Sequence, residues 1–266
     1  MGILGRRRKF CSRGGVRPGR PGGGVKVLGI ETATEFASVA VVEKGEVYVE
    51  ALARLHRRLT EELVLLIRWA LERAGMEPRE LDGVAVSIGP GSFTGLRVGV
   101  ATAKGLCFAC GLPLAAVPTL KAMAARMAHS PFPICPLLDA RRKEVYAALY
   151  RWEEDGLTEA LPPQAFKLEE LLTSLEGPVL FTGDAVGVFK EAIRERLGNG
   201  ALFAPPELSR PHAASVARMG EEALAQGDVS DLSSLEPLYI RSPDVKHIRP
   251  SKPPCPRSSK STPPTT

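Results

Sequence analysis

Residues Gly89–Gly105 read GPGSFTGLRVGVATAKG, a glycine-rich loop that continues into an apolar helix. Loops of this kind often bind phosphate, because the free N–H groups at the start of a helix attract anions. The spacing matches neither common phosphate-binding motif. A Walker loop needs a glycine, four residues and then Gly-Lys-Ser/Thr, and the dinucleotide fingerprint needs a glycine where Thr94 stands. We therefore expect these glycines to serve packing within the protein.

Small residues recur at every fourth position of the expected helix, Gly95–Cys110. Residues four apart lie on one face of a helix. Glycine lowers helix stability, so close packing against another backbone must offset the loss. There are two such series, Gly95, Gly99, Ala103 and Ala101, Gly105, Ala109. We interpret the helix as a packing element, and we expect the N–H groups of the loop to cap helix and strand ends inside the protein.

The surrounding sequence alternates β-rich runs with amphipathic helices. In the first half, three strands, a helix over Thr60–Ala74, a fourth strand and the glycine-loop helix follow one another, with a hairpin turn at Lys44–Gly45. Thr60 is the expected N-cap of the first helix. A second β-β-β-α-β-α order begins near Ile134, and the pattern ends with a short strand over Pro237–Arg241. The repeated order predicts an α/β fold of two lobes that face each other across a cleft.

Charge divides the chain into an acidic middle and two basic ends. The formal net charge is +5, but residues 1–24 contain seven Lys/Arg and no acid, and residues 241–266 contain six Lys/Arg and one acid. The middle then has 22 bases and 29 acids, so its charge does not indicate nucleic-acid binding. The ends are too poor in apolar residues to fold. The predicted domains are a disordered basic extension (1–24), a first lobe (25–113), a reduced second lobe (114–240) and a disordered tail (241–266).

The composition favours a cytoplasmic protein. No apolar run is long enough to span a membrane, so no membrane contact is expected. The five cysteines lack the spacing of a disulfide framework, which is typical of reduced thiols. Cys107 and Cys110 form a CxxC pair inside the expected helix, but one pair cannot complete a tetrahedral zinc site. We therefore expect no metal.

Four segments resemble the TsaB (YeaZ) family in their order and spacing. They read VLGIETATEFASVAVV, SIGPGSFTGLRVGVATAKGL, LLDARRKEVYAALY and PLYIR, and together they cover roughly residues 25–241. The resemblance implies a two-lobed actin-like, sugar-kinase-like fold and a role in making threonylcarbamoyladenosine (t6A37) in bacterial tRNA. It also implies pairing with the catalytic paralogue TsaD, in a complex that the ATPase TsaE completes and through which tRNA is reached. A homodimer is the expected alternative when the protein is alone.

The nucleotide-binding features of that superfamily are degraded in this chain. The first hairpin, Glu31–Phe36, has no glycine, and the second-lobe counterpart, Asp139–Lys143, is bulky and basic. Gly183 stands where two adjacent glycines are usual. We therefore expect no cofactor, and the alternative is a weak residual nucleotide site made of Glu31, Asp139 and Gly183.

No catalytic residue is predicted. The TsaD family binds metal through two histidines four residues apart, whereas no two of the four histidines here lie closer than 35 residues. Ser92 directly follows Gly91, so GPGSFTG is not the G-x-S-x-G nucleophile elbow of a hydrolase. We expect a non-catalytic subunit. One alternative is an actin-fold ATPase or kinase, which nucleotide binding would reveal, and another is direct tRNA binding by the basic ends.

Two helices are predicted to form the partner surface. Along Thr60–Ala74 a broad apolar stripe should face the protein's own sheet. It comprises Leu63, Val64, Leu66, Ile67, Ala70, Leu71 and Ala74. Other apolar residues fall among charged ones on the opposite side, where a tryptophan is a favourable interface anchor. The predicted interface residues are Leu65, Arg68, Trp69 and Glu72 on this helix and Leu96, Arg97, Val100 and Lys104 on the second. We expect both helices to pack against the matching pair of another chain as a four-helix bundle.

Overall fold

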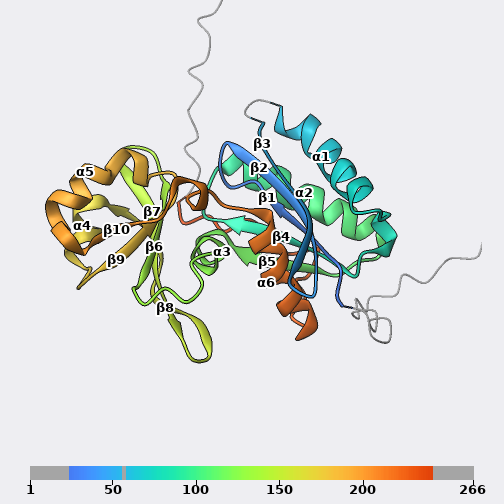
Figure 1. The fold of residues 1–266 in the computed structure, drawn as a ribbon. Coiled ribbons are helices and arrows are strands. Elements are labelled where there is room, and N and C mark those ends of the chain that lie inside the picture. Colours follow the sequence, from blue (N-terminus) through green and yellow to red (C-terminus); the bar gives the residue numbers. More distant parts are fainter. Residues whose placement is uncertain (1–23, 56–57, 242–266) are drawn as a thin grey trace, which may run out of the picture.

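The computed structural model describes residues 24–55 and 58–241. These residues form two five-stranded sheets, one in each of two lobes, with helices packed against them (Figure 1). The strand order is β3-β2-β1-β4-β5 in the first sheet and, read in the same direction, β8-β7-β6-β9-β10 in the second. The two orders correspond strand for strand, so the predicted duplication is confirmed. The predicted disordered ends lie almost entirely outside the described residues.

The first sheet joins an antiparallel meander to two parallel strands. Its strands are β1 (Val27–Glu31), β2 (Phe36–Glu43), β3 (Glu46–Arg54), β4 (Gly83–Gly89) and β5 (Leu114–Pro118). The central strand, β1, pairs antiparallel with β2 and parallel with β4, so Leu28 lies opposite both Val41 and Val84. Lys44 and Gly45 have φ angles of 54° and 73°, as a tight two-residue hairpin requires. The predicted hairpin turn is therefore confirmed.

The second sheet repeats the arrangement. Its strands are β6 (Ile134–Asp139), β7 (Glu144–Glu153), β8 (Gly156–Lys167), β9 (Val179–Thr182) and β10 (Ala201–Phe203). The central strand, β6, pairs antiparallel with β7 and parallel with β9. The edge strand β8 is mostly unburied and contains Pro162 and Pro163, which an edge strand tolerates because its outer N–H groups need no partner strand.

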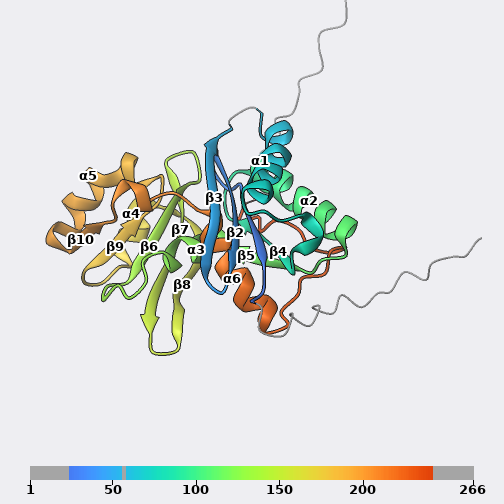
Figure 2. The same cartoon turned by 45° about the vertical axis from the view of Figure 1, so that its right-hand side comes forward.

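Helices cover both faces of the first sheet (Figure 2). They are α1 (Leu59–Arg73), α2 (Phe93–Cys110) and, later in the chain, α6 (Ala213–Ala225). Leu28 and Ile30 belong to the core beneath α1 and α2, whereas Val27 packs with α6. Successive side chains of a strand point to opposite faces, so β1 is buried on both. Because α1 begins at Leu59 with Arg58 as its N-cap, the predicted cap at Thr60 is wrong by two positions.

The second lobe has shorter helices. These are α4 (Leu168–Thr173), α5 (Val186–Leu197) and the 3-10 turns Gly198–Gly200 and Pro206–Leu208. The first lobe contains the 3-10 turn Pro78–Glu80. Between the lobes, α3 (Thr119–Ala125) contacts β6 and β7 on one side and β4 and α6 on the other. It therefore joins the two lobes.

The predicted lobe boundary at residues 113/114 is wrong. Leu114–Pro118 forms the fifth strand of the first sheet, and α6 packs on β1, β2, β4 and β5 of that sheet. The first lobe therefore consists of two chain segments, separated by the second lobe. The predicted strand over Pro237–Arg241 is also wrong, since no strand is present after Phe203 within the described residues.

Candidate functional site

The glycine-rich loop bonds to its own lobe. The Ser92 N–H donates to the Ala33 carbonyl oxygen at 2.6 Å, and the Gly89 N–H donates to Thr119 Oγ1 at 3.1 Å. Ser92 is the N-cap of α2 and its Oγ accepts from the Gly95 N–H at 3.2 Å. Two of these N–H groups therefore bond inside the protein, one to the turn after β1 and one to the first residue of α3, as the packing role predicts, whereas the cap of α2 is the Ser92 side chain.

The first series of small residues on α2 faces Thr32, directly after β1. A Cβ atom on Gly95 would overlap the carbonyl oxygen of Thr32, and one on Gly99 would overlap its Oγ1. Both glycines are buried, as is Ala103. Only residues without a larger side chain allow α2 to lie this close to the end of β1, which confirms the packing role on this side of the helix.

The second series lies on the outer face of α2. Ala101, Gly105 and Ala109 are all exposed, and a Cβ added to Gly105 would meet no atom within 4 Å. The three positions form a ridge of small residues, and the large side chain of Phe108, 67% exposed, stands beside it three residues from Gly105. Another helix can approach such a ridge closely, because interhelical distance depends on the side chains at the contact.

The outer face of α1 exposes large apolar residues. Leu63, Ile67, Ala70 and Leu71 are buried against the sheet as predicted. Leu65 is 53% exposed and Trp69 41%, also as predicted, but Val64 is 56% exposed and does not face the sheet. Val64 lies about 100° around the helix from Leu63, at the margin of the broad predicted stripe, and the sheet covers only the centre of that stripe.

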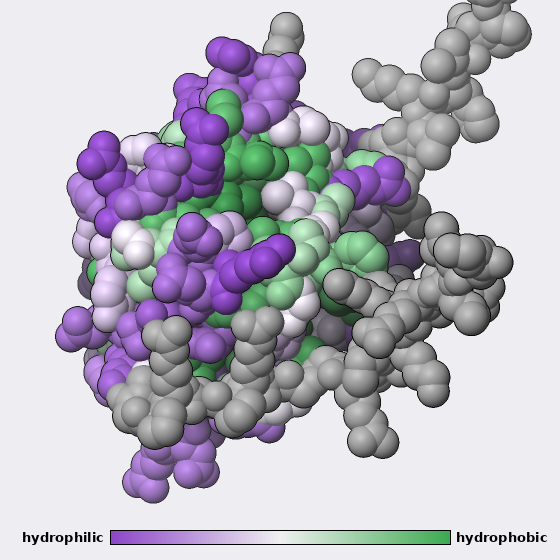
Figure 3. Space-filling view, turned by 90° about the vertical axis from the view of Figure 1, so that its right-hand side faces the viewer, coloured by the Kyte–Doolittle hydropathy of each residue, from purple (hydrophilic) through white to green (hydrophobic). Residues whose placement is uncertain are grey.

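Hydrophobic surface gathers on this side of the molecule. Figure 3 views the side on which α1 and α2 lie in Figure 1, and it shows hydrophobic residues between hydrophilic rims. Arg68 and Glu72 form an exposed ion pair at 3.5 Å, and the Arg73 guanidinium lies 5.8 Å from the Trp69 ring centroid. The four residues predicted on α1 therefore occupy one exposed face.

The four residues predicted on α2 do not form the partner surface that the sequence predicted. Leu96 and Val100 are buried in the chain's own core, so their assignment to a partner surface is wrong. Arg97 and Lys104 contact the segment after α6. Arg97 Nε donates to the Tyr239 hydroxyl at 2.9 Å, and Lys104 Nζ donates to the Leu235 carbonyl oxygen at 3.1 Å. Helical angles alone could not reveal a covering segment from the far end of the chain.

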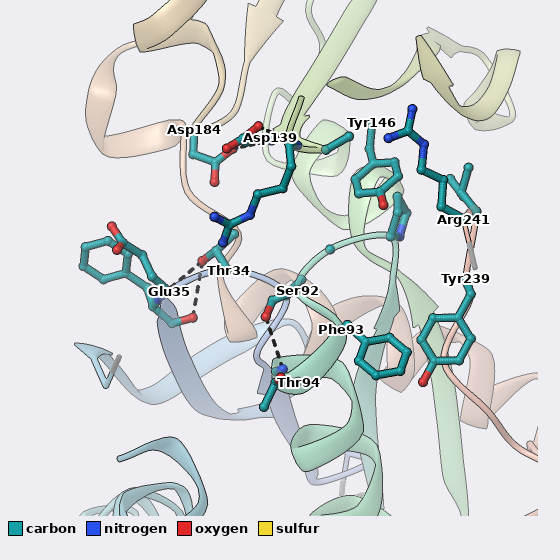
Figure 4. A pocket seen from close by; sticks show the side chains of 18 of the residues that line it. Thr34, Glu35, Ser92, Phe93, Thr94, Asp139, Tyr146, Asp184, Tyr239 and Arg241 are labelled. Carbon is teal, nitrogen blue, oxygen red and sulfur yellow. Dashed lines mark hydrogen bonds between the residues drawn. The ribbon is translucent and has the colours of Figure 1, made fainter. Parts of the chain in front are cut away.

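A cleft of about 1160 Å³ separates the lobes. Figure 4 shows Thr34 and Glu35 on one side, Ser92, Phe93 and Thr94 from the glycine loop and α2 below, Asp139 and Asp184 from the second lobe above, and Tyr239 and Arg241 along the remaining side. The cleft has hydroxyls, carboxylates and guanidinium groups but, within the described residues, no group of three or more His, Cys, Asp or Glu placed to hold a metal ion.

The three residues of the predicted residual nucleotide site do not come together in the cleft. Asp139 lines it, but Glu31 and Gly183 do not. Glu31 is fully buried, and burial raises its pKa to about 7 despite hydrogen bonds from the Ala33 N–H and Ser87. Gly183 has φ of 115°, and a Cβ there would overlap the Leu137 carbonyl oxygen, so this glycine serves close packing on β6. The predicted grouping of these three residues is therefore wrong.

The β6–β7 turn places basic residues at one rim of the cleft. Arg141, Arg142 and Lys143 all have positive φ (66°, 54° and 63°), which is unusual for residues with side chains. The Arg141 N–H donates to Asp139 Oδ1 at 2.8 Å, and the Asp139 N–H donates to Asp184 Oδ1 at 3.2 Å. Burial, together with the nearby Asp139 charge, raises the pKa of Asp184. Sequence reasoning missed Asp184 and Tyr239, which lie far from the turn along the chain.

The cysteine thiols and His212 lie in surroundings that indicate a structural role. Cys107, Cys110 and Cys135 are free thiols, and burial raises the pKa of Cys107 to about 12. His212 Nδ1 lies 3.0 Å from Glu50 Oε2, which fixes the start of α6 to β3. Within the described residues, no helix is long and apolar enough to cross a membrane.

Comparison with known proteins identifies the family. A family model for TsaD, tRNA N6-adenosine threonylcarbamoyltransferase, matches residues 48–247. The tRNA threonylcarbamoyladenosine biosynthesis protein TsaB of Bacillus subtilis is 30% identical over 218 residues, which cover 81% of this chain and 93% of that protein. The chain belongs to the TsaB (YeaZ) family. The TsaB protein of Escherichia coli is likewise 30% identical over 228 residues, covering 82% and 95% of the two chains.

A solved structure supports the family and the fold. The YeaZ structure from Pseudomonas aeruginosa matches with a TM-score of 0.70 at 25% identity, covering 81% of this chain and 99% of that one. A TsaD protein, from Geobacillus thermodenitrificans, is 40% identical over 109 residues, but these cover only 32% of its length. The fold is thus the predicted two-lobed actin-like fold with a reduced second lobe, and membership of the TsaB family gives the chain a role in the biosynthesis of tRNA threonylcarbamoyladenosine.

Proposed function

We propose that this chain is a non-catalytic subunit of the tRNA N6-threonylcarbamoyladenosine (t6A37) machinery that binds a TsaD-type catalytic paralogue through the outer face of α1 and α2. A TsaE-type ATPase would join the same cytoplasmic complex, and tRNA would be reached through it. The observation that supports this most directly is the exposed pair Leu65 and Trp69, four residues apart on an otherwise charged helix face.

The α1–α2 face has the chemistry of a helix-docking surface. Val64, Leu65 and Trp69 offer apolar contacts on α1. On α2 the exposed Phe108 offers another, beside the small residues around Gly105 that a facing helix could approach. Apolar anchors with a charged rim, here Arg68 and Glu72, are typical of specific protein interfaces. Two helices from each protein would form a four-helix bundle, and a second copy of this chain would be the alternative occupant.

The interlobe cleft supports the non-catalytic part of the proposal. Arg141, Arg142 and Lys143 occupy the turn where a phosphate-binding hairpin would need small residues, and Glu31 is buried away from the cleft. We expect the purified chain to hydrolyse neither ATP nor peptides and to transfer no threonylcarbamoyl group. Turnover that survives purification and is lost in Asp139→Ala would contradict this and favour the ATPase or kinase alternative, for which the size of the cleft is the supporting observation.

The interface is tested with the double variant Leu65→Glu, Trp69→Ala. Both side chains are exposed, so the isolated chain should keep its thermal unfolding midpoint, while binding to the catalytic paralogue should weaken by at least ~2 kcal/mol, a hot-spot effect. Phe132→Ala is the matched control, because Phe132 is exposed to a similar degree (38%) but precedes β6 in the second lobe. Titration calorimetry measures the affinity. Unchanged binding by the folded double variant would place the interface elsewhere.

A further inference from the structure

The segment Ser230–Arg241, called here the C-terminal strap, leaves α6 and crosses the first lobe without forming a helix or strand. It starts at the edge of the first sheet, where the Ser230 N–H donates to the Leu114 carbonyl oxygen at 2.8 Å and Ser230 Oγ accepts from the Ala116 N–H at 3.2 Å. Leu232 and Leu235 then pack against the core beneath α1 and α2. The strap is thus anchored along a strand edge and not only at its tip.

The strap next binds the loop that opens α2. The Leu238 N–H donates to the Ile88 carbonyl oxygen at 2.7 Å, directly before the glycine loop. The Tyr239 ring lies 5.0 Å from the Phe93 ring, and its hydroxyl accepts from Arg97 Nε at 2.9 Å. The Arg97 guanidinium also lies 3.8 Å from the Phe93 ring centroid, so the three side chains contact one another as one group. Aromatic and cation–π contacts of this kind add to simple burial.

Two residues later the strap reaches the other lobe. Arg241 forms an ion pair with Glu144, the first residue of β7. Both side chains are partly buried, 34% and 21% exposed, so water screens their attraction less than at an open surface. In Figure 4 Tyr239 and Arg241 stand along one side of the cleft, with Tyr146 of β7 beside Arg241. Leu238–Arg241 therefore contacts the first lobe through Tyr239 and the second through Arg241, across the cleft mouth.

We propose that the C-terminal strap is an intramolecular clasp that holds the two lobes at a fixed opening across the cleft. Its first anchor is the Tyr239–Arg97–Phe93 group, and its second anchor is the Arg241–Glu144 ion pair. The chain passes between the lobes at β5–α3–β6 and at β10–α6. The strap adds a third connection between the lobes, which is non-covalent. Because Tyr239 and Leu235 of the strap accept hydrogen bonds from Arg97 and Lys104 of α2, the clasp also links the opening of the cleft to a helix of the α1–α2 face.

If the strap is a clasp, loss of either anchor should loosen the backbone around the other anchor, although the two anchors lie in different lobes. Amide hydrogen exchange of the full-length chain measures this for Tyr239→Ala, which removes the first anchor, and Glu144→Gln, which weakens the second. With Tyr239→Ala, exchange should rise about fivefold or more in the β6–β7 turn, residues 139–147, which Tyr239 does not bond. With Glu144→Gln, the rise should appear across the glycine loop, residues 88–97.

Two further variants control the experiment. Tyr239→Phe removes only the hydroxyl that accepts from Arg97 and should give a smaller rise at the same two places. Ser233 lies in the strap, and its side chain bonds only Asp231 among the residues that the structure describes, so Ser233→Ala should leave both rims of the cleft unchanged. A rise confined to residues 236–241 would overturn the proposal, because the strap would then be a surface segment without mechanical effect. A uniform rise through both sheets would overturn it as well, since a clasp acts on the cleft rims.

Discussion

The two lobes share one strand order but differ in the helices that follow the same strands. In the first lobe α1 and α2 have 15 and 18 residues, and in the second α4 and α5 have 6 and 12. The outer face of α1 exposes Leu65 and Trp69, whereas α5 presents charged residues such as Glu191 and Arg194, paired at 3.4 Å, and its exposed Val188 lines the cleft. The helix pair of the first lobe is long and partly apolar on its outer face. The pair of the second lobe is short, and its outer face away from the cleft is mostly charged.

This difference shows that the two lobes have diverged on the outer sides of their helices. The buried side of each pair must match its own sheet, so both lobes keep leucine, isoleucine and valine there. The outer side has no such constraint within one chain. An apolar outer face that persists in one lobe alone therefore favours a contact outside the chain as its cause, and the following predictions separate the inner side of α2 from its outer side.

The largest effect is expected from Gly95→Ala on the inner side of α2. The added Cβ would overlap the carbonyl oxygen of Thr32, a backbone atom that cannot rotate away. Overpacking of this kind should lower the free energy of unfolding by about 3 kcal/mol, measured by urea denaturation. The control is Gly187→Ala in α5, where a Cβ meets no atom within 4 Å. A Gly95→Ala variant as stable as the parent would show that α2 does not need this close approach.

Glu31 should make stability fall as pH rises. Burial raises the pKa of this carboxyl from 4.5 to about 7, so the folded state binds a proton that the unfolded state releases. Stability is fully present below pH 4.5 and declines up to about pH 7, by about 3 kcal/mol for a shift of this size. Glu31→Gln removes the titration and should flatten that decline. Parallel curves for the parent and Glu31→Gln from pH 4.5 to 7, by denaturant unfolding, would disprove it.

Glu50 should act in the opposite direction. Burial alone would raise its pKa, but hydrogen bonds from His212, the Ala214 N–H and Ser38 together outweigh burial and lower it. The stability that these bonds give is present above the ordinary glutamate pKa of 4.5 and is lost as pH falls through the lowered folded value. Glu50→Gln at neutral pH leaves donors without a carboxylate and should cost about 2 kcal/mol. The same variant should lose less than the parent on acidification, and an equal loss would exclude this role for Glu50.

The sequence predicted much of the fold because local patterns determine it. Hydrophobic periodicity located both β-β-β-α-β-α orders. The glycines around Thr94 do not have the spacing of a phosphate-binding motif, and this mismatch predicted a packing loop. The errors come from contacts between residues far apart in the chain. Leu114–Pro118 joins the first sheet and α6 returns to it, and neither pairing has a local signal. The hydrogen bonds from Arg97 and Lys104 to the strap had no local signal either, while the exposure of Trp69 followed from helix geometry alone.

The smallest effects are expected from one substitution on the outer side of each helix pair. Gly105→Ala in α2 and Gly187→Ala in α5 both add a methyl group in open space, and alanine favours a helix over glycine. Each variant of the isolated chain should gain up to about 1 kcal/mol in stability, with the smaller gain for Gly187 near its helix start. Only Gly105→Ala should weaken binding to the catalytic paralogue, by about 1 kcal/mol, because its methyl group would separate two closely packed helices. Equal binding by both variants would mean that the partner contacts α1 without approaching α2, and the proposed four-helix bundle would then be wrong even if Trp69 proves to be an anchor.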